Sequence, residues 1–147
     1  MPDGVSSHHC EIREFRISDI ESVRPLWSVS EGLGGPGDAP EGLTRFLKRN
    51  PGLSLVALYQ GSIVGTALCG HDGRRGLIYR LAVADEFRRR GLAAELVARC
   101  LSSLRAEGIE RCLALVHENN LGGREFWTKS GWKLRTDLVT YSFELTV

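Results

Sequence analysis

The residues best suited to bind a charged ligand lie at positions 81–94, where an apolar run meets a basic turn and a helical pattern begins. Three consecutive arginines, 88–90, stand in the turn and are followed by Gly91. Free N–H groups at a helix start and the helix dipole attract anions, and a glycine lets a ligand approach the backbone. The stretch therefore predicts an anion site whose size suits a pyrophosphate.

Two common nucleotide-binding patterns are absent from this stretch. It contains no G-x-x-x-x-G-K-[ST] loop, and Gly91 stands alone rather than in a G-x-G-x-x-G run. The pattern therefore disfavours a nucleoside triphosphate or nicotinamide site.

Alternating and helical patterns predict the elements that position the basic turn. Strands are expected at residues 10–16, 53–59, 63–69, 77–83, 111–116 and 139–147, and the clearest helices at 91–107 and 123–129. With two earlier helices the order is β-α-α-β-β-β-α-β-α-β. We expect one α/β (α+β) domain over residues 1–147, with a mixed, mostly antiparallel central sheet flanked by helices.

Capping patterns predict where the two earlier helices begin. Ser18 and Glu21 fit the S-x-x-E capping box, and Asp38 and Glu41 around Pro40 suggest a second cap with proline in the first turn. Between these helices, residues 31–40 hold four glycines and two prolines and are expected to form a loop.

Two blocks of sequence resemble a known family. The first, Arg88-Arg89-Arg90-Gly91-Leu92-Ala93, fits the pattern [Q/R]-x-x-G-x-[G/A] between a strand and a long helix. The second, residues 120–132, fits most of N-x-x-A-x-x-x-Y-x-K-x-G-F. On these blocks and the element order, the chain resembles the GNAT superfamily of N-acetyltransferases, and most closely its small single-domain bacterial members.

The resemblance implies acetyl-CoA as cosubstrate, no metal, and a small-molecule or peptide amine as acceptor in a direct ternary complex. The cofactor-binding residues implied are Leu81, Ala82 and Val83 for the pantetheine arm, and Arg88, Arg89, Arg90, Gly91, Leu92, Ala93 and Ala94 for the pyrophosphate. The strand at 111–116 should splay from its neighbour and open a slot for the thioester. Asn120 matches a residue that contacts the CoA arm, and an asparagine there suits a helix N-cap equally well.

The family's general acid is usually a tyrosine, and this chain has Trp127 in its place. An indole N–H donates a hydrogen bond but releases no proton near neutral pH, so we expect Trp127 to pack on the CoA arm or to hydrogen-bond the sulfur. Tyr79 and Tyr141 are the other aromatic candidates, although each also fits a half-buried strand tyrosine.

The general base has no clear signature, because Tyr79 and Arg80 stand where many members carry a carboxylate. Glu118 is the first candidate and His117 the second. Glu118 also fits a solvated carboxylate at a strand end. Because neither a general acid nor a general base is identified, a second hypothesis is that the chain is a non-catalytic acyl-CoA-binding sensor.

Charge and composition limit the partners. The 147 residues are 42% apolar and 25% charged with a net charge of +1, so a strongly basic nucleic-acid binder is not expected. Residues 1–41 carry a net charge of −5, which would suit a cationic acceptor, and six arginines against two acids lie in residues 74–90, around the anion site.

Location and assembly are expectations of the same kind. Neither a membrane-spanning run nor a signal peptide is recognisable. Four cysteines without C-x-x-C spacing favour reduced, buried thiols in the cytoplasm. The resemblance also implies that a homodimer can form.

Overall fold

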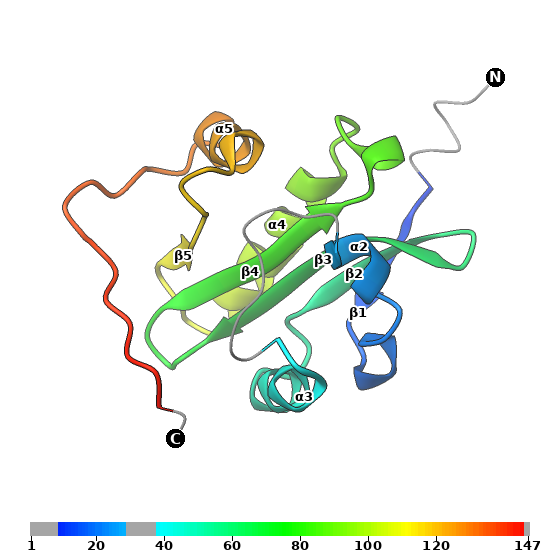
Figure 1. Cartoon of the computed structure of the whole chain (residues 1–147), viewed down its shortest axis with the longest axis horizontal. Coiled ribbons are helices and arrows are strands. Elements are labelled where there is room, and N and C mark those ends of the chain that lie inside the picture. Colours follow the sequence, from blue (N-terminus) through cyan, green and yellow to red (C-terminus); the bar gives the residue numbers. More distant parts are fainter. Residues whose placement is uncertain (1–8, 29–37, 146–147) are drawn as a thin grey trace.

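The fold is known from a computed structural model that describes residues 9–28 and 38–145 (Figure 1). One sheet carries the strand order β1-β2-β3-β4-β5, in which the first four strands run antiparallel and β5 runs parallel to β4. The strands are β1 (Glu11–Glu14), β2 (Leu55–Tyr59), β3 (Ser62–His71), β4 (Gly76–Val83) and β5 (Cys112–Ala114). The predicted mixed, mostly antiparallel sheet is confirmed.

Helices cover both faces of this sheet (Figure 1). The α-helices are α2 (Arg24–Ser28), α3 (Pro40–Arg49), α4 (Leu92–Ala106) and α5 (Leu121–Lys129), and single 3₁₀ turns lie at η1 (Ile17–Asp19) and η2 (Asp85–Phe87). Helix α4 packs on one face, whereas η1, α2 and α3 pack on the other. No described helix has the length and apolar character needed to cross a membrane.

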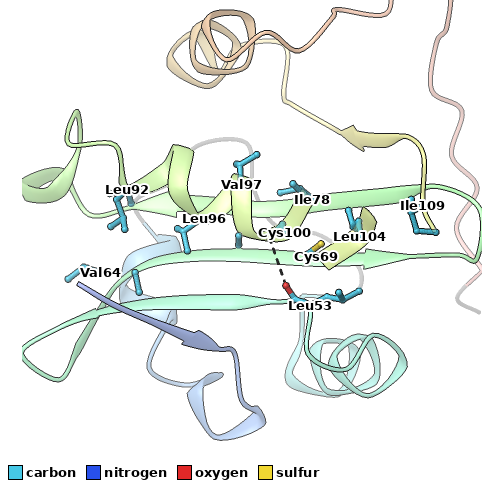
Figure 2. Close-up of a cluster of buried hydrophobic side chains, with 13 residues drawn as sticks. Leu53, Val64, Cys69, Ile78, Leu92, Leu96, Val97, Cys100, Leu104 and Ile109 are labelled. Atoms are coloured by element: carbon cyan, nitrogen blue, oxygen red, sulfur yellow. Dashed lines mark hydrogen bonds between the residues drawn. The ribbon is translucent and has the colours of Figure 1, made fainter. Parts of the chain in front are cut away.

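Helix α4 packs on the sheet through one stripe of apolar side chains that recur at helical spacing in the sequence (Figure 2). Leu96, Cys100 and Leu104 are buried against β3 and β4, and Gly108 ends the helix with a φ of +83°. On the opposite face, Phe15 and Trp27 pack with the apolar residues of α3. The sheet therefore separates two cores, and α4 is held firmly enough to fix the position of its N-terminus.

The first helical segment differs from the prediction. A continuous helix capped by Ser18 and Glu21 is wrong, because the chain forms η1 and then the short α2. Asp19 supplies the cap instead: its carboxylate accepts a hydrogen bond of 2.8 Å from the N–H of Arg16 and pairs with the guanidinium of Arg13. Pro25 lacks an N–H, so it fits only the first turn of a new helix.

The buried cap makes stability depend on pH. Burial raises the pKa of Asp19, but hydrogen bonds from Arg13 and Arg16 lower it more, so the pKa lies below its usual value of 3.8. Because the pKa is lower in the folded than in the unfolded state, the ionised carboxylate stabilises the fold above about pH 4. This stabilisation is lost as the pH falls and the carboxylate becomes protonated. We expect Asp19→Asn to cost about 2 kcal/mol in urea unfolding at pH 7 and much less at pH 3. An equal cost at both pH values would contradict this account.

The last predicted strand is also corrected. Residues 139–145 of the predicted strand 139–147 form no strand. The segment alternates as a strand should, but it has no neighbouring strand to complete its backbone hydrogen bonds, and Figure 1 shows it running apart from the sheet. Strand β5 is likewise shorter than the predicted 111–116.

Candidate active site

The predicted anion site lies at the turn between β4 and α4. Arg89 and Gly91 have φ values of +63° and +83°, and Gly91 is the N-cap of α4. In the described part of the chain, none of the N–H groups of residues 89–94 donates a hydrogen bond. A Cβ at Gly91 would meet open space. The turn therefore presents a cradle of backbone donors at a helix N-terminus, which suits a phosphate or pyrophosphate.

Side chains tie this cradle to the strand before it. Arg88 donates through Nε to the carbonyl oxygen of Val83 at 3.0 Å, and its Nη1 lies 3.1 Å from Asp85. The guanidinium of Arg90 lies over the ring of Phe87, 5.9 Å from its centroid. All three arginines are exposed, so they add positive charge around the cradle without filling it.

The sheet opens beside this strand. Strands β4 and β5 pair only from Gly76 to Ile78, against Cys112 to Ala114. Beyond that point the edge of Tyr79–Val83 that faces β5 has no partner strand among the described residues, whereas Ala82 and Val83 pair with β3 on the other side. The splay implied for the strand at 111–116 is therefore observed beside Leu81, Ala82 and Val83, and an extended ligand can add to this edge.

Arg80 lies at an irregularity in β4 and organises a buried polar network, which sequence reasoning missed. Its φ is +51°, and its side chain is only 9% exposed. Nη2 donates to Asp38 at 2.5 Å, and the guanidinium stacks 4.6 Å from the Trp27 ring centroid. The Trp27 indole donates to the Thr66 hydroxyl, which in turn donates to the carbonyl of Arg80. We call these four residues the Arg80 network.

Asp38 therefore does not cap α3 as predicted. The N-cap is Ala39, no side chain caps that end, and only the proline at the first helical position is as expected. The carboxylate is held by Arg80, so its charge is neutralised by a guanidinium rather than displayed to an acceptor. Of the other acidic residues in the stretch 1–41 that gives the net charge of −5, Glu41 is exposed and Glu31 lies outside the described residues.

The three predicted catalytic residues are not brought together. Tyr79 is half-buried on the face covered by α3, with its ring edge-on to Phe46, and burial raises its pKa. Glu118 is exposed in the loop after β5, and Tyr141 is 90% exposed in the C-terminal segment. Within the described residues, no acid–base pair is assembled around the opening.

Asn120 and Trp127 have structural roles of their own. The Asn120 carboxamide oxygen accepts a hydrogen bond of 2.9 Å from the N–H of Gly123, so the N-cap role is observed. Trp127 packs edge-on against Trp132 and Phe126, with ring centroids 4.4 and 5.1 Å apart. These three half-buried rings pack α5 against the core between α4 and the sheet.

Comparison with known proteins agrees with this geometry. Residues 20–132 match the family model for the acetyltransferase (GNAT) family. An acetyltransferase of Photorhabdus laumondii is 44% identical over 111 residues, which is 75% of this chain and 77% of that protein. The protein described here belongs to the GNAT family of acetyltransferases.

Solved structures show the same fold. Ard1 from Thermoplasma volcanium superposes with a TM-score of 0.73 and 26% identity, covering 83% of this chain and 81% of that one. The acetyltransferase AAC(6')-Iy, in complex with the bisubstrate analog CoA-S-monomethyl-acetylneamine, gives a TM-score of 0.72 at 19% identity, covering 92% and 99%. At that identity the second comparison shows the fold alone. Among the described residues there is no cluster of His, Cys, Asp and Glu suited to a metal ion.

Proposed function

We propose that the chain transfers an acetyl group from acetyl-CoA to a primary amine in a direct ternary complex. One observation carries the proposal: the N–H cradle at residues 89–94 lies at the end of the open edge of β4. A pyrophosphate in the cradle would direct an extended arm along Leu81, Ala82 and Val83 toward the splay. This is the path that a CoA thioester requires, and the likeness to a structure holding a CoA-containing analog supports it.

The proposed reaction requires little acid–base catalysis by the protein. The neutral amine attacks the thioester carbonyl, a C–N bond forms, the C–S bond breaks, and the proton of the amine passes to a base or water. A backbone N–H near Val83 is the candidate donor to the developing oxyanion. The thiolate is a fair leaving group by itself, which is consistent with a tryptophan at the usual position of the acid.

Activity is tested by following thiol release from acetyl-CoA with a panel of peptide and small-molecule amines. Turnover that depends on the amine supports the enzyme. Tight CoA binding without turnover on any amine favours the second candidate, an acyl-CoA sensor. The scattered positions of Tyr79, Glu118 and Tyr141 are the observation that keeps this second function in view.

Trp127→Tyr should keep or raise the rate of thiol release. A phenol fills most of the space of the indole, remains able to pack on Trp132, and can also give a proton to the leaving sulfur. Trp132→Tyr is the matched control, because it alters the other ring of the same contact. A fall of more than tenfold for Trp127→Tyr alone would show that the indole has a specific role.

Glu118→Gln tests the base. If the Glu118 carboxylate takes the proton of the amine, kcat/KM should fall by about 10²-fold, in the usual range for loss of a general base. The decline in rate that protonation of the base causes at acid pH should disappear as well. Glu125→Gln, which breaks only an exposed pair with Lys129, should leave the pH profile unchanged. An unaltered profile in Glu118→Gln would remove Glu118 from the mechanism.

A further inference from the structure

The arginines that the sequence gathers in residues 74–90 are divided between the two ends of β4. Residues 88–90 lie at the cradle, whereas Arg74 and Arg75 lie in the turn that precedes the strand. The eight residues of β4 between them span about 26 Å of extended chain. Figure 1 shows β5 beside the start of β4 and the turn toward α4 at its other end. The expected grouping of all these charges around one anion site is therefore wrong, and Arg74 and Arg75 need a separate explanation.

A hollow of about 380 Å³ opens at the start of β4. It is lined by Arg74 and Arg75 of the β3–β4 turn and by Glu110 and Arg111 of the loop between α4 and β5. We call Arg74, Arg75 and Arg111 the hollow arginines. The lining carries three positive charges against one negative charge. Its volume lies at the lower end of the range for small-molecule sites, about 300–1,000 Å³.

The backbone joins the two sides of the hollow. The N–H of Gly76 donates to the carbonyl oxygen of Arg111 at 2.8 Å, where the pairing of β4 with β5 begins. Gly76 is buried, and a Cβ at this position would lie 2.7 Å from Cδ1 of Leu104. The absence of a side chain lets α4 pack close to the strand, and the loop after the helix is thereby brought beside the turn before β4.

Arg75 and Arg111 stand opposite each other at the start of two neighbouring strands. They directly precede Gly76 and Cys112, which are paired in parallel register, so their backbones lie about one strand spacing, roughly 4.8 Å, apart. Like charges opposite each other on neighbouring strands destabilise a sheet. The arrangement therefore costs stability in the free protein and becomes favourable when one anion is bound by both guanidinium groups.

The carboxylates around the hollow have other partners. Asp72 accepts hydrogen bonds of 2.8 and 2.9 Å from two backbone N–H groups of its own turn. Asp137 pairs with Arg135 at 3.0 Å. In the part of the chain that the structure describes, no carboxylate lies within ion-pair distance of a hollow arginine. The three guanidinium groups therefore keep their N–H donors for a ligand.

We infer that the hollow binds a small phosphorylated molecule that carries at least two negative charges. A guanidinium group donates two parallel hydrogen bonds to a phosphate, and hollow arginines on both sides of the opening favour a diphosphate over a single phosphate group. The volume leaves room for an organic group beside the diphosphate. This site lies apart from the cradle, so the inference does not depend on the proposed activity.

Calorimetry with inorganic pyrophosphate tests the site in the full chain. The titrations start from Gly91→Glu, which removes the cradle as a competing site. We expect this variant to bind pyrophosphate, and adding Arg75→Gln or Arg111→Gln should lower the affinity about tenfold, the usual loss for a hydrogen bond to a charged group. Arg49→Gln is the matched control, because it removes an equally exposed arginine from α3 on the other face of the sheet. It should leave the affinity unchanged.

Glu110→Gln should change the affinity in the opposite direction. It removes the one negative charge of the lining, so pyrophosphate should bind about two- to fivefold more tightly, whereas a change that only disturbed the loop would weaken binding. Titration with ADP distinguishes the source of the diphosphate: tighter binding than that of pyrophosphate indicates a nucleotide, and equal binding indicates a free polyphosphate.

Titration with CoA separates this site from the cradle. Arg75→Gln in the otherwise unchanged protein should leave the CoA affinity as it is, whatever the outcome of the activity assays. Two results would overturn the inference: no pyrophosphate binding in Gly91→Glu, or binding that Arg75→Gln and Arg111→Gln leave intact.

Discussion

Gly91→Glu should abolish CoA binding, measured by calorimetry with CoA itself. The new carboxylate would stand at the mouth of the N–H cradle, where a Cβ meets no protein atom, and would repel the phosphates that the cradle is built to hold. Loss of the helix N-terminal site together with like-charge repulsion should lower affinity by at least 10³-fold, about 4 kcal/mol.

Gly108→Glu is a close control for this variant. Gly108 ends the same helix with the same φ of +83° and an equally open surrounding. Both variants force a side chain into the left-handed region at about 1 kcal/mol of unfolding free energy, so their stabilities should be similar. Only Gly91→Glu should lose the ligand. CoA affinity retained in Gly91→Glu would remove the pyrophosphate from this turn.

Asp38→Ala should be the most damaging single change to stability outside the apolar cores. It leaves the guanidinium of Arg80, 9% exposed, without its carboxylate. Uncompensated burial of a charge typically costs about 3–5 kcal/mol, and the partial exposure of Asp38 places the expected loss near about 3 kcal/mol. Urea unfolding at pH 7 measures it.

Two further variants make the Asp38 result interpretable. Glu95→Ala breaks the exposed pair with Arg99 and should change the unfolding free energy by less than about 1 kcal/mol. Adding Arg80→Met to Asp38→Ala removes the orphaned charge and keeps the stem over Trp27, so much of the lost stability should return. If Asp38→Ala proves as stable as the parent protein, solvent must reach the guanidinium of Arg80.

The parts that sequence predicted well are those coded by local pattern. The stripe ending at Leu104 and the glycines at both ends of α4 identify that helix and its cradle, because helix period and left-handed caps are read from neighbouring residues. The order of the elements through α5 was predicted in the same way, and this order together with the two sequence blocks identified the family.

The parts that sequence did not predict depend on distant partners. Asp19 and Asp38 both stand where a helix can begin, and only the folded chain shows that the first caps the turn after Arg16 while the second pairs with Arg80. The Arg80 network joins residues 27, 38, 66 and 80, whose spacing has no period. The strand predicted from the alternation at 139–145 is wrong, because alternation specifies which side chains share a face and does not provide a neighbouring strand.

The packing of α4 on the sheet also limits access to two cysteines. Cys69 of β3 and Cys100 of α4 share a contact in the core, and the hydrogen bond with Cys100 together with burial raises the pKa of Cys69. While the helix packs on the sheet, both sulfurs are buried, so oxidants and alkylating agents do not reach them. Reaction at either sulfur therefore requires α4 to separate from β3, so an alkylating reagent would report how often the helix leaves the sheet.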